Sequence, residues 1–382
     1  MSRIDELIKE KCPNGVEYKE LGSVIEITKG IQFNKENMND EGTYPVINGG
    51  INPSGYIEQY NNLENTITIS QGGASAGFVN WITTKFWAGA HCYVVKPLPI
   101  VDVRYIYHFL KSQEYKLKEC QYGAGIPALS KATVTSLEIP VPPIEIQQEI
   151  VRILDKFTEL EAELQAELDA RKKQYEYYRD ELLTLPETSR MSLSSITLKV
   201  GSIDWKKYNS TKKYIDLSSV DRETHTIIDD DVIEISSENA PSRAKQIVNL
   251  FGGTRPMLKR YCKVSSEYDE QVCSTGYCVL RVDNKIALTN YVYYCLGTSE
   301  FYRYVESNQQ GASYPAIGDT VLKAYEIPIP SIEIQKKIVE NLDYVDNLCD
   351  DIEKGLPAEI EARHKQYEYY RDKLLTFERK VV

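Results

Sequence analysis

The sequence predicts an α+β fold in which two globular heads are each followed by a long helix. The two helices are expected to pack as an antiparallel coiled coil with pseudo-twofold symmetry. The main observation is a repeat: RKKQYEYYRDELLT at 171–184 returns as RHKQYEYYRDKLLT at 363–376, with 12 of 14 positions identical. Each copy ends a run of apolar residues at helical spacing. The regions before the repeat units, 1–106 and 187–292, lack comparable similarity to each other.

Further matches extend the repeat toward the heads. QYGAGIPAL (121–129) returns as QQGASYPAI (309–317), and EIPVP (138–142) returns as EIPIP (326–330). We infer two heads of different specificity on a shared support, because drift after duplication does not explain why only one region stayed nearly identical. The predicted domains are a first head (1–140), a first helical spacer (141–186), a second head (187–330) and a second helical spacer (331–382).

Length and composition indicate a folded protein of the cytoplasm. The 382 residues suffice for two or three domains, and 42% hydrophobic with 26% charged residues is ordinary for globular proteins. No run approaches 18 apolar residues, and the start lacks the apolar core of a signal peptide. The eight cysteines are scattered without a C-x-x-C pair, as expected of free thiols.

The heads contain short alternating segments typical of β-strands. These are NTITISQ (65–71), FVNWITTKFW (78–87) and YCVLRVD (277–283). EIPVP and EIPIP are also strand-like, and their prolines end each strand before the long helical run begins.

The helical spacers carry apolar residues in steps of three and four, which predicts that they pack on each other. The predicted helix-packing residues are Ile150, Phe157, Leu164, Leu168, Tyr175, Tyr178, Leu182, Ile338, Val345, Ile352, Ile360, Tyr367, Tyr370 and Leu374. The second spacer is four residues longer and contains Gly355 and Pro357. Either these residues form a stutter in a continuous helix, or the helix stops and restarts with Pro357 in its first turn. We favour the break.

The net charge of −11 is concentrated in the spacers. Residues 141–186 contain 11 acidic and 6 basic residues, and residues 331–382 contain 12 and 9. The heads are therefore nearly neutral, so a local basic patch on them could bind nucleic acid. The acidic spacers suit contacts with proteins.

Sequence motifs for catalysis are scarce. The chain has neither a G-x-x-x-x-G-K-[ST] phosphate loop nor an H-E-x-x-H zinc motif, and its four histidines suggest no metal cluster. The glycine-rich QGGASAG (71–77) is interpreted as a tight turn between strands, and Asp229–Asp231 as a solvated turn.

Amide, aromatic and basic side chains of the heads are the candidates for DNA contacts. Arginine pairs with guanine edges, asparagine and glutamine pair with adenine, and lysine contacts phosphates. In the first head the candidates are Gln32, Asn34, Lys35, Asn48, Gln71, Trp81 and Lys85. In the second head they are Lys206, Lys207, Lys212, Lys213, Arg243, Lys245, Arg255, Lys259 and Arg260. For each, ordinary surface polarity is the alternative interpretation.

Several of these segments resemble the DNA specificity subunit of type I restriction-modification systems. The resemblance lies in LIKEKCPNGVEYKELGSV (7–24), the G-x-x-x-P-A segments, EIP[VI]P followed by IEIQ, and the repeated QYEYYRD helix. YIDLSSVDRET (214–224), APSRAKQIV (240–248) and CSTGYCVLR (273–281) resemble one type of target recognition domain. The segment VNLFGGTRPML differs from the sequence that is usual at this place in the family.

This resemblance implies that the heads are target recognition domains, each reading one half of a split, asymmetric duplex DNA sequence. The helices would fix the gap and bind two methyltransferase subunits and, through them, two motor-nuclease restriction subunits. S-adenosylmethionine, ATP and Mg would belong to those partners, and this chain would bind no cofactor or metal and have no enzymatic activity alone. Two alternatives stay open: the specificity subunit of a system whose partner fuses methyltransferase and nuclease, and a coiled-coil scaffold that joins two protein-binding heads.

Overall fold

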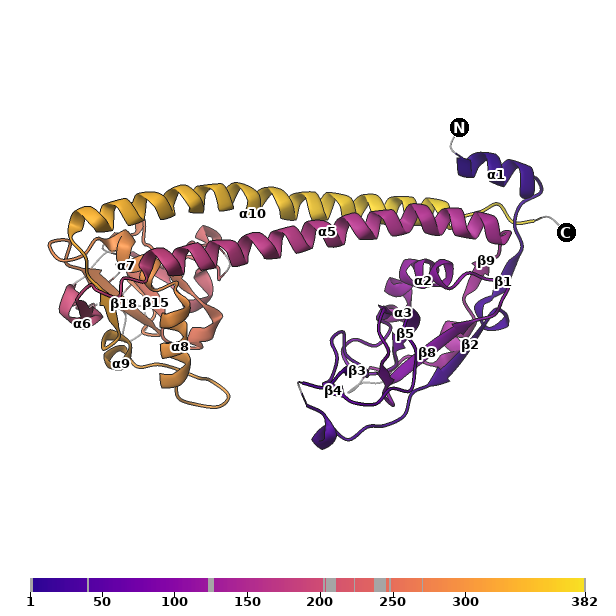
Figure 1. The fold of residues 1–382 in the computed structure, drawn as a ribbon, viewed down its shortest axis with the longest axis horizontal. Coiled ribbons are helices and arrows are strands. Elements are labelled where there is room, and N and C mark those ends of the chain that lie inside the picture. Colours follow the sequence, from indigo (N-terminus) through magenta and orange to yellow (C-terminus); the bar gives the residue numbers. More distant parts are fainter. Residues whose placement is uncertain are drawn as a thin grey trace. The chain divides into compact units, whose positions relative to one another are not determined.

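The computed structural model describes most of the chain and divides it into two compact units (Figure 1). The described residues are 3–39, 41–122, 127–201, 203, 211–222, 224–236, 245–246, 249–269 and 271–380. Unit 1 comprises Met1–Gln165 and Leu356–Val382, and unit 2 comprises Ala166–Gly355. Each unit therefore contains one head together with part of each long helix.

Unit 1 is built on a four-stranded antiparallel sheet with the strand order β2-β8-β5-β6. Its strands are β2 (Ile25–Lys29), β5 (Thr66–Ser70), β6 (Val79–Ile82) and β8 (Cys92–Pro97). A smaller sheet has the order β4-β3-β7, with β3 (Tyr44–Ile47), β4 (Tyr56–Ile57) and β7 (Trp87–Ala88). The predictions of strands within 65–71 and 78–87 are thus confirmed.

The sheet and several helices together form the core of unit 1. The helices of the head are α1 (Arg3–Lys11), α2 (Val103–Ser112), α3 (Glu114–Glu119) and α4 (Lys131–Thr135), with 3₁₀ helices η1 (Leu21–Ser23) and η2 (Lys35–Asn37). Asp102 caps α2, because its carboxylate accepts hydrogen bonds from the backbone N–H of Arg104 and Tyr105. Ile67 and Ile69 of β5 pack with buried residues of α2 in one cluster.

Unit 2 contains two four-stranded sheets with the orders β11-β18-β15-β16 and β13-β12-β17-β14. The strands of the first are β11 (Thr197–Leu198), β15 (Asn249–Gly252), β16 (Tyr261–Cys262) and β18 (Tyr277–Val282). Those of the second are β12 (Lys212–Ile215), β13 (Ile233–Ile235), β14 (Lys245–Gln246) and β17 (Val272–Cys273). The predicted strand at 277–283 is therefore confirmed as β18.

Short helices complete unit 2. They are α6 (Leu193–Ile196), α7 (Thr289–Cys295), α8 (Ser299–Asn308) and α9 (Asp319–Lys323), with 3₁₀ helices η4 (Leu217–Ser219), η5 (Asp229–Asp231), η6 (Pro256–Leu258) and η7 (Ser266–Tyr268). The predicted turn at Asp229–Asp231 is thus one turn of 3₁₀ helix. Phe251, Tyr291 and Phe301 are fully buried in the main core of this unit.

A short strand pair precedes each long helix. In unit 1, β1 (Tyr18–Glu20) pairs antiparallel with β9 (Glu138–Pro140). In unit 2, β10 (Arg190–Ser192) pairs antiparallel with β19 (Glu326–Pro328). These pairs confirm that EIPVP and EIPIP are strands that their prolines end.

The long helices α5 (Ile144–Leu183) and α10 (Ile332–Leu374) run antiparallel within each unit (Figure 1). In unit 1, Ile150 near the start of α5 shares a core cluster with Leu374 at the end of α10. In unit 2, Leu183 at the end of α5 shares a cluster with Ile338 near the start of α10. The predicted antiparallel packing is thus confirmed in both units.

The favoured break at Gly355 and Pro357 is wrong, because α10 is a single helix with Pro357 in its interior. A proline removes one backbone N–H and with it one hydrogen bond of the helix. The turns on both sides keep their own hydrogen bonds, so the helix continues as the stutter alternative requires.

The predicted helix-packing residues differ in burial. Ile150, Leu168, Ile338 and Tyr367 are buried, whereas Phe157, Leu164, Tyr175, Leu182, Val345, Ile360 and Leu374 are partly buried. The side chain of Ile352 lies outside the described residues. Contrary to the prediction, Tyr178 is 47% exposed and Tyr370 is 41% exposed, although the Tyr370 ring stacks on Phe157.

Two arginines take the inward positions that the sequence pattern assigned to these tyrosines. Arg179 and Arg371 are 7% and 8% exposed. Each guanidinium lies over the ring of the tyrosine one turn earlier, at 5.7 Å from the centre of Tyr175 and 5.4 Å from that of Tyr367. Each arginine also pairs with the aspartate that follows it. Stacking and pairing together allow these charges to be buried.

In the part of the chain that the structure describes, none of the helices is long and apolar enough to span a lipid bilayer.

Candidate nucleic-acid interface

A buried glutamine at the start of each long helix attaches the helix to its head. The side-chain oxygen of Gln147 accepts a hydrogen bond from Asp102 N at 2.8 Å, and its Nε2 donates to Pro142 O at 2.8 Å. Gln335 makes the same bonds with Leu288 N and Pro330 O, at 2.8 and 2.9 Å. The glutamine of the repeated IEIQ therefore ties each head to the start of its long helix.

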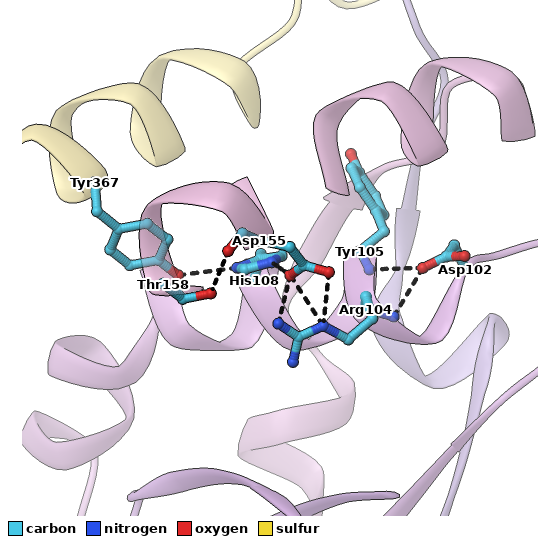
Figure 2. Close-up of polar contacts among 7 residues, drawn as sticks. All are labelled: Asp102, Arg104, Tyr105, His108, Asp155, Thr158 and Tyr367. Atoms are coloured by element: carbon cyan, nitrogen blue, oxygen red, sulfur yellow. Dashed lines mark hydrogen bonds and ion pairs between the residues drawn. The ribbon is translucent and has the colours of Figure 1, made fainter. Parts of the chain in front are cut away.

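A polar node in unit 1 joins α2 of the head to both long helices (Figure 2). We define it as His108 on α2, Asp155 on α5 and Tyr367 on α10. His108 Nε2 lies 2.8 Å from Asp155 Oδ1, and His108 Nδ1 lies 2.9 Å from the Tyr367 hydroxyl. Arg104 also pairs with Asp155, through Nε at 3.0 Å from Oδ1. The imidazole is fully buried, so these bonds are shielded from water.

The protonation states of the node follow from its surroundings. Burial lowers the pKa of His108 below 6.5, although the hydrogen bond that His108 donates to Asp155 acts to raise it. Burial opposes ionisation of Asp155, but hydrogen bonds from His108 and Arg104 outweigh it and lower the pKa of that carboxyl. At neutral pH the imidazole is thus neutral and the carboxylate charged. His108 Nε2–H therefore donates to Asp155, and the Tyr367 hydroxyl donates to Nδ1.

Unit 2 contains an equivalent node with different chemistry. Tyr294 on α7 stands at the repeat position of His108, and its hydroxyl donates to Asp343 Oδ1 at 2.6 Å. Asp346 Oδ2 is 3.4 Å from the same hydroxyl, and the Asp346 carboxylate also accepts a hydrogen bond from Tyr175. Burial raises the pKa of both tyrosines, so they remain protonated donors. The acids and the repeated tyrosine come from opposite long helices in the two units.

An open groove of about 810 Å³ lies beside the unit 1 node. It is lined by Asn65, Asn80, Trp81, Thr83, Val103, Arg104, Tyr107, Asp155, Thr158, Glu159 and Ala162. The Arg104 guanidinium lies 4.6 Å from the ring centre of Trp81 and is paired with Asp155. Trp81 is therefore packed into a wall of the groove, and the positive charge of Arg104 is already neutralised.

The first-head candidates separate into exposed and structural residues. Gln32, Asn34 and Lys35 are exposed in the segment between β2 and β3. Asn48 Oδ1 accepts a hydrogen bond from His91 N at 2.9 Å, and Lys85 lies 4.7 Å from the ring centre of Tyr60.

Gln71 is partly buried, and its side-chain oxygen lacks a hydrogen-bond partner among the described residues. Gln71 begins the QGGASAG segment, which joins the antiparallel strands β5 and β6 as predicted. The segment contains the spacing G-x-S-x-G at 73–77, but it lacks the strand-to-helix turn on which a nucleophilic serine is presented.

The second-head candidates gather on β12 and at the ends of η6. Lys212 and Lys213 lie on β12, where Lys213 Nζ is 4.7 Å from the ring centre of Tyr268. Arg255 and Lys259 flank η6 and are both exposed. Arg260 is half-buried. Lys206, Lys207, Arg243 and the side chain of Lys245 lie outside the described residues.

Comparison with known families decides the identity of the chain. The family model described as "Type I restriction modification DNA specificity domain" matches residues 13–170 and 261–362. The chain belongs to this family. A type I restriction enzyme specificity subunit of Escherichia coli is 31% identical over 96% of this chain and 96% of its own length. A protein of Haemophilus influenzae named a putative type I restriction enzyme specificity subunit is 27% identical over 95% and 96%.

A solved structure shares the fold. The S subunit of a type I restriction-modification system from M. genitalium has a TM-score of 0.52 and 20% identity, covering 94% of this chain and 96% of that chain. This chain is thus a DNA sequence-specificity subunit of the type I restriction-modification family, with the mixed α/β heads and long helices of its solved relative.

The specificity-family match covers the helix attachments and the head and acidic members of both nodes, but it leaves out residues 171–260 and those after 362, and with them Tyr175 and Tyr367. Within that gap lie β12 with Lys212 and Lys213, and the loop that carries Arg255 and Lys259. The sequence analysis missed Arg179, Gln147 and His108, and only their place in the duplicated segments could have marked them.

Proposed function

We propose that this specificity subunit reads a split, asymmetric sequence in double-stranded DNA, one half with each head. The proposal rests on one contrast: the two heads are attached to the long helices in the same way, but the loops that the heads expose are different. The two heads join their helices through equivalent glutamines and equivalent nodes. Their strands and exposed side chains nevertheless differ, and two different readers select an asymmetric target.

We further propose that the long helices hold two methyltransferase subunits and, through them, motor-nuclease restriction subunits. The repeated segment leaves Tyr177 and Tyr369 exposed by 64% and 62% at equivalent positions. Exposed aromatic residues are typical of protein-binding surfaces, and two copies suit two copies of one partner. S-adenosylmethionine, ATP and Mg are assigned to those partners. This chain positions their chemistry in the cytoplasm without catalysing a reaction of its own.

The test is to express the chain with its cognate methyltransferase subunit in a host that lacks other DNA methylation, and to map N6-methyladenine across the genome. We expect a split asymmetric motif with a fixed gap, which is lost when this chain is omitted. Absence of methylation that depends on this chain would refute the proposal, provided the methyltransferase is active with another specificity subunit. That result would favour the scaffold alternative.

Exchange of one head tests the modular part of the proposal. Replacing residues 1–140 with the first head of another specificity subunit is expected to change one half of the motif and leave the other half and the gap intact. A change in both halves would contradict independent reading by the two heads.

A further inference from the structure

In each unit, two loop segments are joined by backbone hydrogen bonds at the end of a central strand. We call this pair of segments the loop platform. In unit 1 the segment after β5 pairs with the G-x-x-x-P-A segment, through Gly73 N to Pro127 O at 2.9 Å and Leu129 N to Gln71 O at 2.7 Å. In unit 2 the segment after β15 makes the same pair of bonds, through Arg255 N to Pro315 O at 2.7 Å and Ile317 N to Gly253 O at 2.9 Å. Arg255 therefore occupies the backbone position of Gly73.

Both residues at this position have left-handed backbone conformations. The φ angle of Gly73 is +87°, and that of Arg255 is +48°. A glycine adopts this conformation freely, whereas a residue with a side chain pays about 1 kcal/mol or more. Such strain tends to be kept where the side chain has a function. Unit 2 thus places an arginine where the equivalent turn in unit 1 has no side chain.

The Arg255 side chain is exposed and lies against a tyrosine ring. Its guanidinium carbon lies 4.2 Å from the ring centre of Tyr314, which is itself 69% exposed. Among the described residues, none of the carboxylates forms an ion pair with Arg255. Lys259, at the other end of η6, differs because its Nζ lies 3.8 Å from Glu176.

The stacked arrangement leaves the hydrogen-bonding edge of the guanidinium available. The tyrosine ring lies against the guanidinium and restricts its position, and a ring contact of this kind leaves the N–H donors of the planar group free to bind a ligand. A hollow of about 300 Å³ adjoins it, lined by Arg255, Met257, Leu258, Ser313 and Pro315. A planar fork of donors matches the O6 and N7 acceptors of guanine, which is the commonest base contact of arginine in the major groove.

We propose that Arg255 and Tyr314 form the element of the second head that reads one guanine of the DNA target. Arg255 donates to guanine O6 and N7, and Tyr314 is a positioning residue that holds the guanidinium in the plane of the base. The inference rests on the proposed function, since it names the base contact made by one of the two heads.

The test compares methylation maps for the wild-type chain and its variants, each expressed with the cognate methyltransferase subunit. Arg255→Gly is the central variant, because glycine suits the left-handed backbone and matches Gly73, so it is expected to fold. The wild-type motif is expected to contain a guanine in the second half-site. In Arg255→Gly that one position becomes degenerate, while the first half-site and the gap stay unchanged.

The expected size of the effect follows from the energy of a bidentate base contact, about 1–3 kcal/mol, which corresponds to roughly 5- to 150-fold preference for guanine. This preference should fall to about threefold or less in Arg255→Gly and stay low in Arg255→Lys, whose ammonium lacks the fork. Tyr314→Leu should weaken it in part, and Tyr314→Phe should keep it. Arg303→Ala is the matched control, since Arg303 is an exposed arginine of the same unit on α8.

Three results would overturn the proposal. The first is an unchanged motif in Arg255→Gly, and the second is a wild-type second half-site that lacks guanine on both strands. The third is an equal loss of DNA affinity for all sequences together with a reduced salt dependence of binding, which indicates a phosphate contact. Absence of chain-dependent methylation with the wild type would instead count against the proposed function, so the two failures are distinguishable.

Discussion

The unit 1 node predicts that Asp155→Asn destabilises unit 1 more than the equivalent Asp343→Asn destabilises unit 2. Asp155 accepts a hydrogen bond from the buried His108 and an ion-paired contact from Arg104, and its side chain is only 28% exposed. Hydrogen bonds to a charged group contribute about 1.5–3 kcal/mol each, and the amide of asparagine retains part of one. We therefore expect the free energy of unfolding of unit 1 to fall by about 2–3 kcal/mol.

Asp343 is the matched control because the repeat places it at the same position of the other long helix. It accepts one hydroxyl hydrogen bond from Tyr294, for which Asp346 is a second acceptor. Loss of its charge leaves the tyrosine with a partner, so about 1 kcal/mol or less is expected for unit 2.

Hydrogen exchange in the full chain can measure both effects at once. Peptides from α2 and the first half of α5 report on unit 1, and peptides from α7 and the first half of α10 report on unit 2. Each variant leaves the other unit as an internal reference. Equal losses in the two units, or a loss below about 1 kcal/mol in unit 1, would refute the reasoning that the node carries a charge-assisted attachment.

Two further predictions concern pH and the long helices. Burial, aided by Lys259 and Arg179, lowers the pKa of His225 to about 4, so the native state releases a proton that the unfolded state still binds below about pH 6.5. The stability of unit 2 should therefore fall by about 1.4 kcal/mol per pH unit from 6.5 toward 4. Asparagine tolerates the left-handed φ of 54° at this position, so His225→Asn is the variant to test. Urea unfolding at several pH values should show that this variant loses the dependence of stability on pH between 6.5 and 4. An unchanged dependence would contradict the assignment to His225. Insertion of four residues near Leu356 adds about one turn and roughly 6 Å of helix, so the methylated motif should gain about one or two base pairs in its gap. Altered half-sites in that map would argue against the helices as a ruler.

The sequence predicted those features that a local pattern determines. Alternation in 65–71 and 277–283 marks β5 and β18, since each strand buries its residues against its own sheet. The repeat predicted the antiparallel helices, because two similar apolar surfaces in one chain pack on each other. The predicted break at Gly355 and Pro357 does not occur, because a proline removes only one hydrogen bond of the helix and the turns on either side continue.

Other features depend on partners far away in the chain and could not be predicted. His108 joins both long helices only because α10 brings Tyr367 to it from 259 positions away in the chain. In the sequence, Arg179 looks like an ordinary surface charge, and only the structure shows that it lies over the Tyr175 ring and pairs with Asp180. The left-handed backbone of Arg255 is equally invisible, because the sequence around it resembles an ordinary loop with a proline.

The shared loop platform explains how a duplicated chain can come to read two different sequences. Two backbone hydrogen bonds hold the platform in each unit, and neither depends on which side chain stands at the left-handed position. A substitution there changes the groups offered to a ligand without disturbing the strands, the glutamine attachments or the nodes. The cost is backbone strain of about 1 kcal/mol when glycine is replaced, which is small beside the stability of a domain. Recognition can therefore vary at the loop while the position of the head on its helices is kept.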